Sequence, residues 1–118
     1  MKNSVNPYEM YRKPGIPESG PIRHGHRVLP VFSAEKESIQ IITADAGYNR
    51  VALGYNIYFE NGRNAYRLPS LESGWYVNEQ EAILFFLGYV KKYSCLFSKE
   101  AIAEVNRQIM LHSQMSLF

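Results

Sequence analysis

A pattern of alternating apolar residues runs through residues 51–63, VALGYNIYFENGR. From Val51 to Phe59, every second residue is a large apolar or aromatic one. A period of two residues places such side chains on one face of a β-strand, so the pattern predicts a strand with one buried face. The Asn-Gly pair that follows is typical of a two-residue hairpin turn, so an antiparallel partner strand is expected directly after it.

The predicted turn also sets a register between the two strands. With Asn61 and Gly62 at the centre of the turn, Ile57 lies opposite Tyr66 on the buried face. The pattern of side chains and the chemistry of the turn therefore agree with each other, as expected for a sequence that specifies one structure.

The other face of this hairpin mixes amide, guanidinium and phenol groups. The same register pairs Asn56 with Arg67 and Tyr58 with Ala65. Two interpretations are open: a surface that stacks bases or holds phosphates, or the ordinary solvated face of an antiparallel sheet. We favour the solvated face.

Two helices are predicted after the sheet. Asn78 is a good N-cap and Glu81 stands three residues on, as in a capping box. A broad apolar stripe on this first helix is expected to cover the sheet and comprises Ala82, Phe85, Phe86, Tyr89, Val90 and Tyr93. A second helix is expected to begin at Ser98 and to continue through Val105 and Ile109.

The predicted fold class is α+β: an antiparallel meander of three or four strands packed against one or two C-terminal helices, with an extended Pro-rich N-terminal arm. The predicted parts are the arm at residues 1–30, a single α+β domain at residues 31–113 and a docking tail at residues 114–118. A chain of 118 residues is long enough to bury a modest core without metal or disulfide staples.

The N-terminal arm is interrupted by prolines and carries the positive charge of the chain. Residues 1–30 contain five Lys or Arg against two Glu, whereas the chain as a whole has a net charge of only +2. Tyr8, Met10 and Tyr11 form an apolar cluster in the arm. We expect this cluster to dock on the domain itself, on another subunit, which would give a homodimer, or on a partner.

Candidate contacts to DNA or RNA come from this arm and from the sheet. Cations next to phenols and histidines suit phosphate binding, although five cations in thirty residues are a weak signal and a solvated linker is favoured. The candidate residues are Arg12, Lys13, Arg23, Arg27, Arg67 and Tyr58.

Motifs of the common enzyme classes are missing from the sequence. It contains no Gly-rich phosphate loop, no Gly-x-Ser-x-Gly elbow and no His-Glu-x-x-His helix. His24 and His26 flank a glycine, but the third histidine, His112, is far away in sequence, and a metal site needs three or four ligands. The sequence thus predicts no enzyme, no catalytic residue, no cofactor and no metal.

The single cysteine and the lack of long apolar runs indicate the cellular setting. Cys95 cannot form an internal disulfide and is expected to be a buried, inert thiol. The polar start lacks the apolar core of a signal peptide, and no apolar run approaches about 18 residues. We therefore expect a cytoplasmic protein without a membrane partner.

The last five residues, Gln114-Met115-Ser116-Leu117-Phe118, resemble the bacterial sliding-clamp-binding motif, whose general pattern is Gln-Leu-Ser/Asp-Leu-Phe. Four of the five positions match, and Met115 replaces a leucine by a side chain of similar size. The resemblance implies that the Gln114 amide is hydrogen-bonded at one subsite, while Leu117 and Phe118 fill an apolar pocket on the clamp. Alternatively, the second helix continues to the terminus and buries Met110, Leu117 and Phe118.

Residues 51–93 are also similar, in order of elements and patterning, to small sheet-plus-helix modules of plasmid, phage and conjugative-element proteins. Together the two resemblances favour a non-enzymatic accessory protein of bacterial or mobile-element DNA metabolism, tethered to the sliding clamp by its C-terminal tail. The alternative is a protein–protein interaction module, such as an inhibitor or a structural subunit, with a packed C-terminus and no clamp binding.

Overall fold

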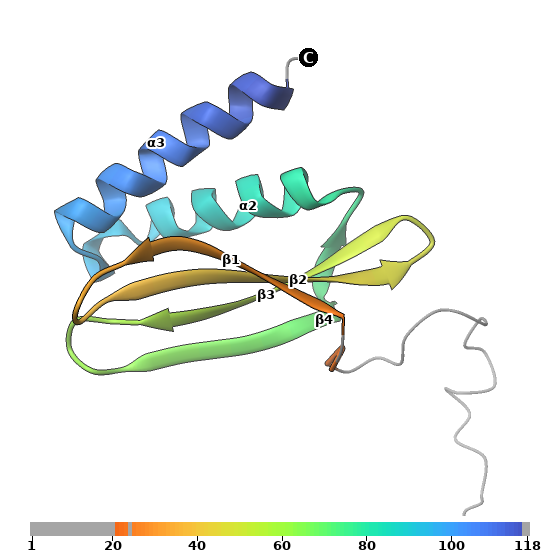
Figure 1. Ribbon diagram of the computed structural model, residues 1–118, viewed down its shortest axis with the longest axis horizontal. Coiled ribbons are helices and arrows are strands. Elements are labelled where there is room, and N and C mark those ends of the chain that lie inside the picture. The colour runs from red at the N-terminus through yellow and green to blue at the C-terminus, as the bar shows by residue number, and fades with distance from the viewer. Residues whose placement is uncertain (1–20, 24, 117–118) are drawn as a thin grey trace, which may run out of the picture.

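Four antiparallel strands form one sheet, whose order in space, β1-β2-β3-β4, is also their order in the chain. The computed structural model describes residues 21–23 and 25–116, without the side chains of residues 72, 73 and 114–116. The elements in that part of the chain are β1 (His26–Ser33), β2 (Ser38–Gly47), β3 (Arg50–Tyr58), β4 (Asn64–Tyr76), α2 (Glu79–Lys92), the 3-10 turn η1 (Ser94–Leu96) and α3 (Lys99–Ser116). Both α-helices lie on the same side of the sheet (Figure 1). The expected α+β meander followed by two helices is confirmed.

Strand β1 begins within the predicted arm, since its residues 26–30 were assigned to the arm and residues 31–33 to the domain. It pairs along β2, with Val28 opposite Ile42. Pro30 is tolerated because β1 is an edge strand, which needs hydrogen bonds on one side only, and the register shifts directly after it. The packed structure also begins earlier than residue 31, since Ile22 is buried. Residues 1–20 of the predicted arm lie outside the described part of the chain.

The hairpin between β3 and β4 exists, but its predicted register is wrong by one residue. Ile57 lies opposite Ala65 instead of Tyr66. The reason is a three-residue loop: the Phe59 N–H donates to the Arg63 carbonyl at 2.9 Å, and Gly62 adopts the left-handed region at φ 90°. An Asn-Gly pair suits this longer turn as well as the two-residue one, because both need a residue with positive φ.

The backbone of β4 passes directly over Gly54. Here one residue of β3 opposes two of β4, Leu68 and Pro69, so the ladder contains a bulge. A Cβ atom on Gly54 would lie 2.3 Å from the Arg67 carbonyl oxygen and 2.6 Å from the Pro69 nitrogen. Because both obstacles are backbone atoms, only glycine fits this position.

Capping residues fix the start of each helix. The Asn78 side chain accepts a hydrogen bond from the Glu81 N–H at 2.8 Å, and the Ser98 hydroxyl accepts one from the Ala101 N–H at 3.1 Å. Glu37, between β1 and β2, is buried and accepts hydrogen bonds from both the N–H and the hydroxyl of Ser98. Both predicted helix starts are confirmed, and the buried carboxylate of Glu37 anchors α3 to the sheet.

The buried face of α2 differs from the predicted stripe. Phe86 and Val90 are buried as expected, but Phe85, Tyr89 and Tyr93 are exposed by 54%, 43% and 40%. Their place in the core is taken by Ile83 and Leu87. The reason is that α2 packs against α3 as well as the sheet, which moves the centre of its buried face toward α3.

Replacing Gly54 by Ala is expected to destabilise the fold by more than about 3 kcal/mol, because the added methyl group meets the β4 backbone. Gly88 provides the matched control: it lies within α2, and a Cβ there would meet nothing within 4 Å. Gly88→Ala should therefore stabilise the protein by up to about 1 kcal/mol. Urea unfolding of both variants measures the difference. Equal effects of the two substitutions would contradict the close approach at Gly54.

Candidate functional site

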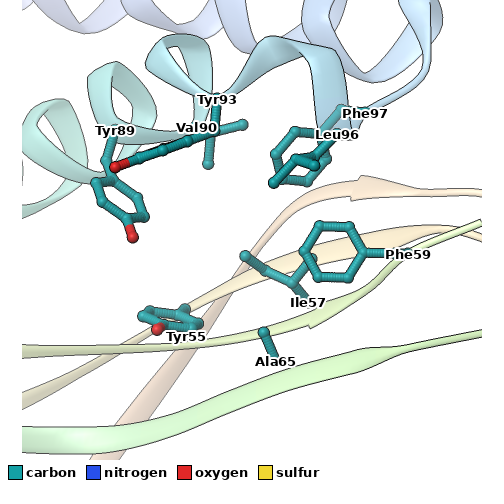
Figure 2. Close-up of a pocket in the computed structure, with 9 residues that line it drawn as sticks. All are labelled: Tyr55, Ile57, Phe59, Ala65, Tyr89, Val90, Tyr93, Leu96 and Phe97. Atoms are coloured by element: carbon teal, nitrogen blue, oxygen red, sulfur yellow. The ribbon is translucent and has the colours of Figure 1, made fainter.

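An apolar pocket of about 250 Å³ lies between the sheet and the end of α2. Figure 2 shows its walls: β3 and β4 form the floor, while α2 and the segment around η1 form the roof. It is lined by Tyr55, Ile57, Phe59, Ala65, Tyr89, Val90, Tyr93, Leu96 and Phe97. No carboxylate is among these lining residues.

The two ends of the pocket differ in polarity. The apolar end consists of Ile57, Phe59, Leu96 and Phe97, with the Phe59 and Phe97 ring centroids 5.3 Å apart. The phenol end consists of Tyr55, Tyr89 and Tyr93, and their three hydroxyl oxygens lie on the same side of the pocket in Figure 2. The pocket thus combines an apolar interior with a hydrogen-bonding rim.

Local structure explains how these residues come together. Tyr55 and Ile57 are two residues apart in β3, so both face the helices. Phe59, at the start of the loop, packs on the same side. Tyr89 and Tyr93 are one turn apart and touch, with ring centroids 5.0 Å apart. The sequence predicted both the β3 residues and the α2 tyrosines as parts of a filled core. The pocket was missed because the packing of α3, which turns the α2 tyrosines outward, cannot be read from the α2 stripe alone.

A second exposed cluster sits at the turn between β2 and β3. The Arg50 guanidinium carbon lies 5.7 Å from the centre of the Tyr48 ring and 5.6 Å from that of Trp75. Arg50 also donates hydrogen bonds to the carbonyl oxygens of Gly47 and Ala46, at 3.1 Å and 3.2 Å. Tyr48 and Trp75 remain about half exposed. The cluster is therefore a fixed stack of two rings and a cation on the protein surface.

The backbone of this turn is unusual. Tyr48 and Asn49 have φ values of 55° and 58°, as in a type I′ turn. Asparagine adopts this conformation readily, whereas a residue with a large side chain does so at a cost. The exposed Tyr48 ring thus occupies a position that local backbone preference would give to Asn or Gly.

Two of the predicted nucleic-acid contacts, Arg67 and Tyr58, lie on opposite faces of the sheet. Arg67 lies opposite Tyr55 and thus on the helix-facing side of the sheet, whereas Tyr58 lies on the other side, opposite Asn64. Arg27 forms an ion pair with Glu79 at 3.0 Å. The shifted register is the reason that Arg67 and Tyr58 were wrongly placed on one face.

Three further basic candidates come from the arm. Arg23 is exposed just before β1, and Arg12 and Lys13 lie outside the described residues. The open face opposite the helices instead carries Tyr58 and Tyr66, both about half exposed.

The C-terminal peptide begins inside α3. The helix extends to Ser116, so residues 114–116 are helical in backbone, while Leu117 and Phe118 lie outside the described residues. Before the peptide begins, Met110 is already 64% exposed and Leu111 46% exposed. The alternative of a packed terminus predicted that Met110 is buried, and for this residue it is wrong. Among the described side chains of α3, Ile109 is the last apolar one that packs against the core, while His112 is half-buried, and α3 slants away from the sheet toward its carboxyl end (Figure 1).

One strongly shifted carboxyl group lies on α3. A hydrogen bond from Arg107, followed by one from Gln108, lowers the pKa of Glu104 to about 2. Gln108 also donates to the Val31 carbonyl oxygen at 2.9 Å, so this polar group joins α3 to β1. None of these side chains lines the pocket, and their hydrogen bonds dock α3 on β1.

Metal-ligating side chains do not gather in the described part of the chain. In residues 21–23 and 25–116, no three His, Cys, Asp or Glu side chains are placed as they would be around a metal ion. Cys95, expected to be buried, is exposed, because η1 follows the buried face of α2 and contributes no buried side chain. No helix in these same residues combines the length and the apolar character needed to cross a membrane.

Comparisons with known proteins add no further assignment. No protein-family model, curated protein or solved structure matches this chain.

Trp75 is the single tryptophan of the chain, so its fluorescence reports directly on the stack around Arg50. Arg50→Ala should shift the Trp75 emission and lower stability by about 1–2 kcal/mol, because one cation–π pair at an exposed site is worth roughly 0.5–1 kcal/mol and two hydrogen bonds are also lost. Arg63→Ala, in the exposed β3–β4 loop, is the control and should change neither. An unchanged spectrum of the Arg50 variant would exclude the stack.

Proposed function

We propose that this chain is a non-enzymatic, cytoplasmic accessory protein of bacterial or mobile-element DNA metabolism, which docks on the sliding clamp through Gln114–Phe118. The observation that carries the proposal is the match of these residues to the clamp-binding pattern, in a segment that follows Ile109, the last apolar core residue among the described side chains of α3. A docking peptide must be available to its partner, and exposure of the preceding helical turn supports that availability.

The exposed turn before the peptide supports the proposal energetically. Met110 and Leu111 are both large apolar residues at the surface, so the helix makes little contact with the core there. A contact that does hold this region is the hydrogen bond from the Gln80 side chain to the His112 carbonyl oxygen, at 2.7 Å. Unwinding the final turn from Gln114 onward would break helix hydrogen bonds at an end that frays easily, at low cost.

The folded part would bind a second partner while the tail holds the protein on the clamp. Tethering raises the local concentration of a binding module near its target without any new contact. The stack of Tyr48, Arg50 and Trp75 presents the residue types that dominate protein–protein hot spots, on a rigid turn. We infer that the module presents this surface to a protein partner while the tail holds the clamp.

A specific observation also favours the second candidate function, a protein–protein interaction module without clamp binding. The same stack would serve an inhibitor or a structural subunit equally well. The helical backbone of residues 114–116 fits this alternative, because a helical terminus does not need to open for another partner. The two candidates differ only in what the last five residues do.

Binding to a purified bacterial sliding clamp distinguishes them. The intact protein should bind, and Leu117→Ala/Phe118→Ala should weaken binding by at least about a hundredfold, since burial of a Leu or Phe side chain is worth roughly 1.5–3 kcal/mol. Met110→Ala, which truncates an exposed apolar side chain one turn earlier, is the matched control and should bind as the parent does. Isothermal titration calorimetry measures all three.

Equal clamp binding by the parent and the double variant, or no binding by either, would contradict the tether. If neither protein binds the clamp but both still bind a protein partner, the interaction module is favoured.

A further inference from the structure

The pocket beneath the end of α2 has the features of a ligand site with a preferred orientation. Its apolar end excludes water from a hydrocarbon group, and its phenol end offers three hydroxyl groups. Small-molecule sites commonly combine a mostly apolar lining with a few polar groups that orient the ligand. A ligand with one apolar end and one polar end would match both halves.

Two cations stand beside the phenol end. Arg67 is the cross-strand partner of Tyr55, so the two residues share the helix-facing side of the sheet. The Lys92 ammonium nitrogen lies 5.8 Å from the centre of the Tyr93 ring. Arg67 is exposed and forms no ion pair with the described carboxylates. The lining itself contains no charged residue, so Arg67 and Lys92, which stand next to lining tyrosines, are the charges that an anion at the phenol end would meet among the described side chains.

The volume limits the apolar part of the ligand. An apolar cavity of about 150 Å³ holds a benzene molecule. The pocket, at about 250 Å³, has room for one ring and a short chain.

We propose that this pocket binds a small carboxylic acid that carries an aromatic ring or a branched hydrocarbon group. The hydrocarbon lies against the apolar end. The carboxylate lies at the phenol end, where tyrosine hydroxyls donate hydrogen bonds to it and Arg67 and Lys92 complement its charge. This site is separate from the C-terminal peptide, so its success or failure is independent of clamp binding.

The probe for this proposal is 3-phenylpropionate, compared with 3-phenylpropan-1-ol, which has the same ring and chain without the charge. Amide shifts in NMR spectra of the intact chain should change saturably for residues of the pocket, with a Kd on the order of 1 mM for the acid. The alcohol should bind at least about fivefold more weakly, because it lacks the charge-assisted hydrogen bonds.

Substitutions separate the roles of charge and space. Arg67→Ala should weaken binding of the acid by about three- to tenfold and leave the alcohol unchanged, whereas Arg63→Ala, in the exposed β3–β4 loop and not paired with a lining tyrosine, should change neither. Ala65→Leu should fill the pocket and abolish binding of both probes. If that variant does not fold, Ala65→Val tests the same point with a smaller group.

The proposal is overturned if neither probe gives saturable shifts, or if acid and alcohol bind equally and Arg67→Ala has no effect. Unchanged binding to a folded Ala65 variant would also overturn it, because the ligand would then sit elsewhere.

Discussion

The packing of α2 between the sheet and α3 is the contact on which the other features depend. A helix that covered the sheet alone would bury Phe85, Tyr89 and Tyr93, but α3 draws the buried face toward Ile83 and Leu87. The tyrosines on the opposite flank of α2 are consequently left at the surface. The apolar pocket forms below this flank, and the carboxyl end of α3 is directed away from the sheet (Figure 1).

The polar anchors of α3 make this packing specific. The buried Glu37 carboxylate fixes the first turn of α3, and Gln108 joins the middle of the helix to β1. A buried carboxylate is stable only when its oxygens are hydrogen-bonded, so loss of the Ser98 donors would leave the Glu37 carboxylate unsatisfied. Loss of Gln108 would remove the side-chain donor to the Val31 carbonyl oxygen. Beyond Ile109 the described contacts of α3 include the hydrogen bond from the Gln80 side chain to the His112 carbonyl oxygen, and the proposal takes the peptide that begins at Gln114 to be separable from the anchored part.

Short-range chemistry in the sequence was enough to predict the later strands and both helices, but not β1, most of which falls in the predicted arm. Alternation in residues 51–59 gave a strand, and Asn78 and Ser98 gave helix starts, because strands and caps depend on a few neighbouring residues. The register after Gly62 could not be derived, since Asn-Gly fits two loop lengths. The faces of α2 and the pocket could not be derived either, because they depend on where α3 packs. The C-terminal peptide and the acid-binding pocket stay predictions.

We infer that the core is complete without residues 114–118. Deletion of these five residues, followed by urea unfolding, measures whether they contribute to it. A complete core predicts a change in the free energy of unfolding below about 0.5 kcal/mol, as for surface residues away from the core. A loss of more than about 2 kcal/mol would contradict it, because it would mean that large apolar side chains of the peptide are buried in the fold.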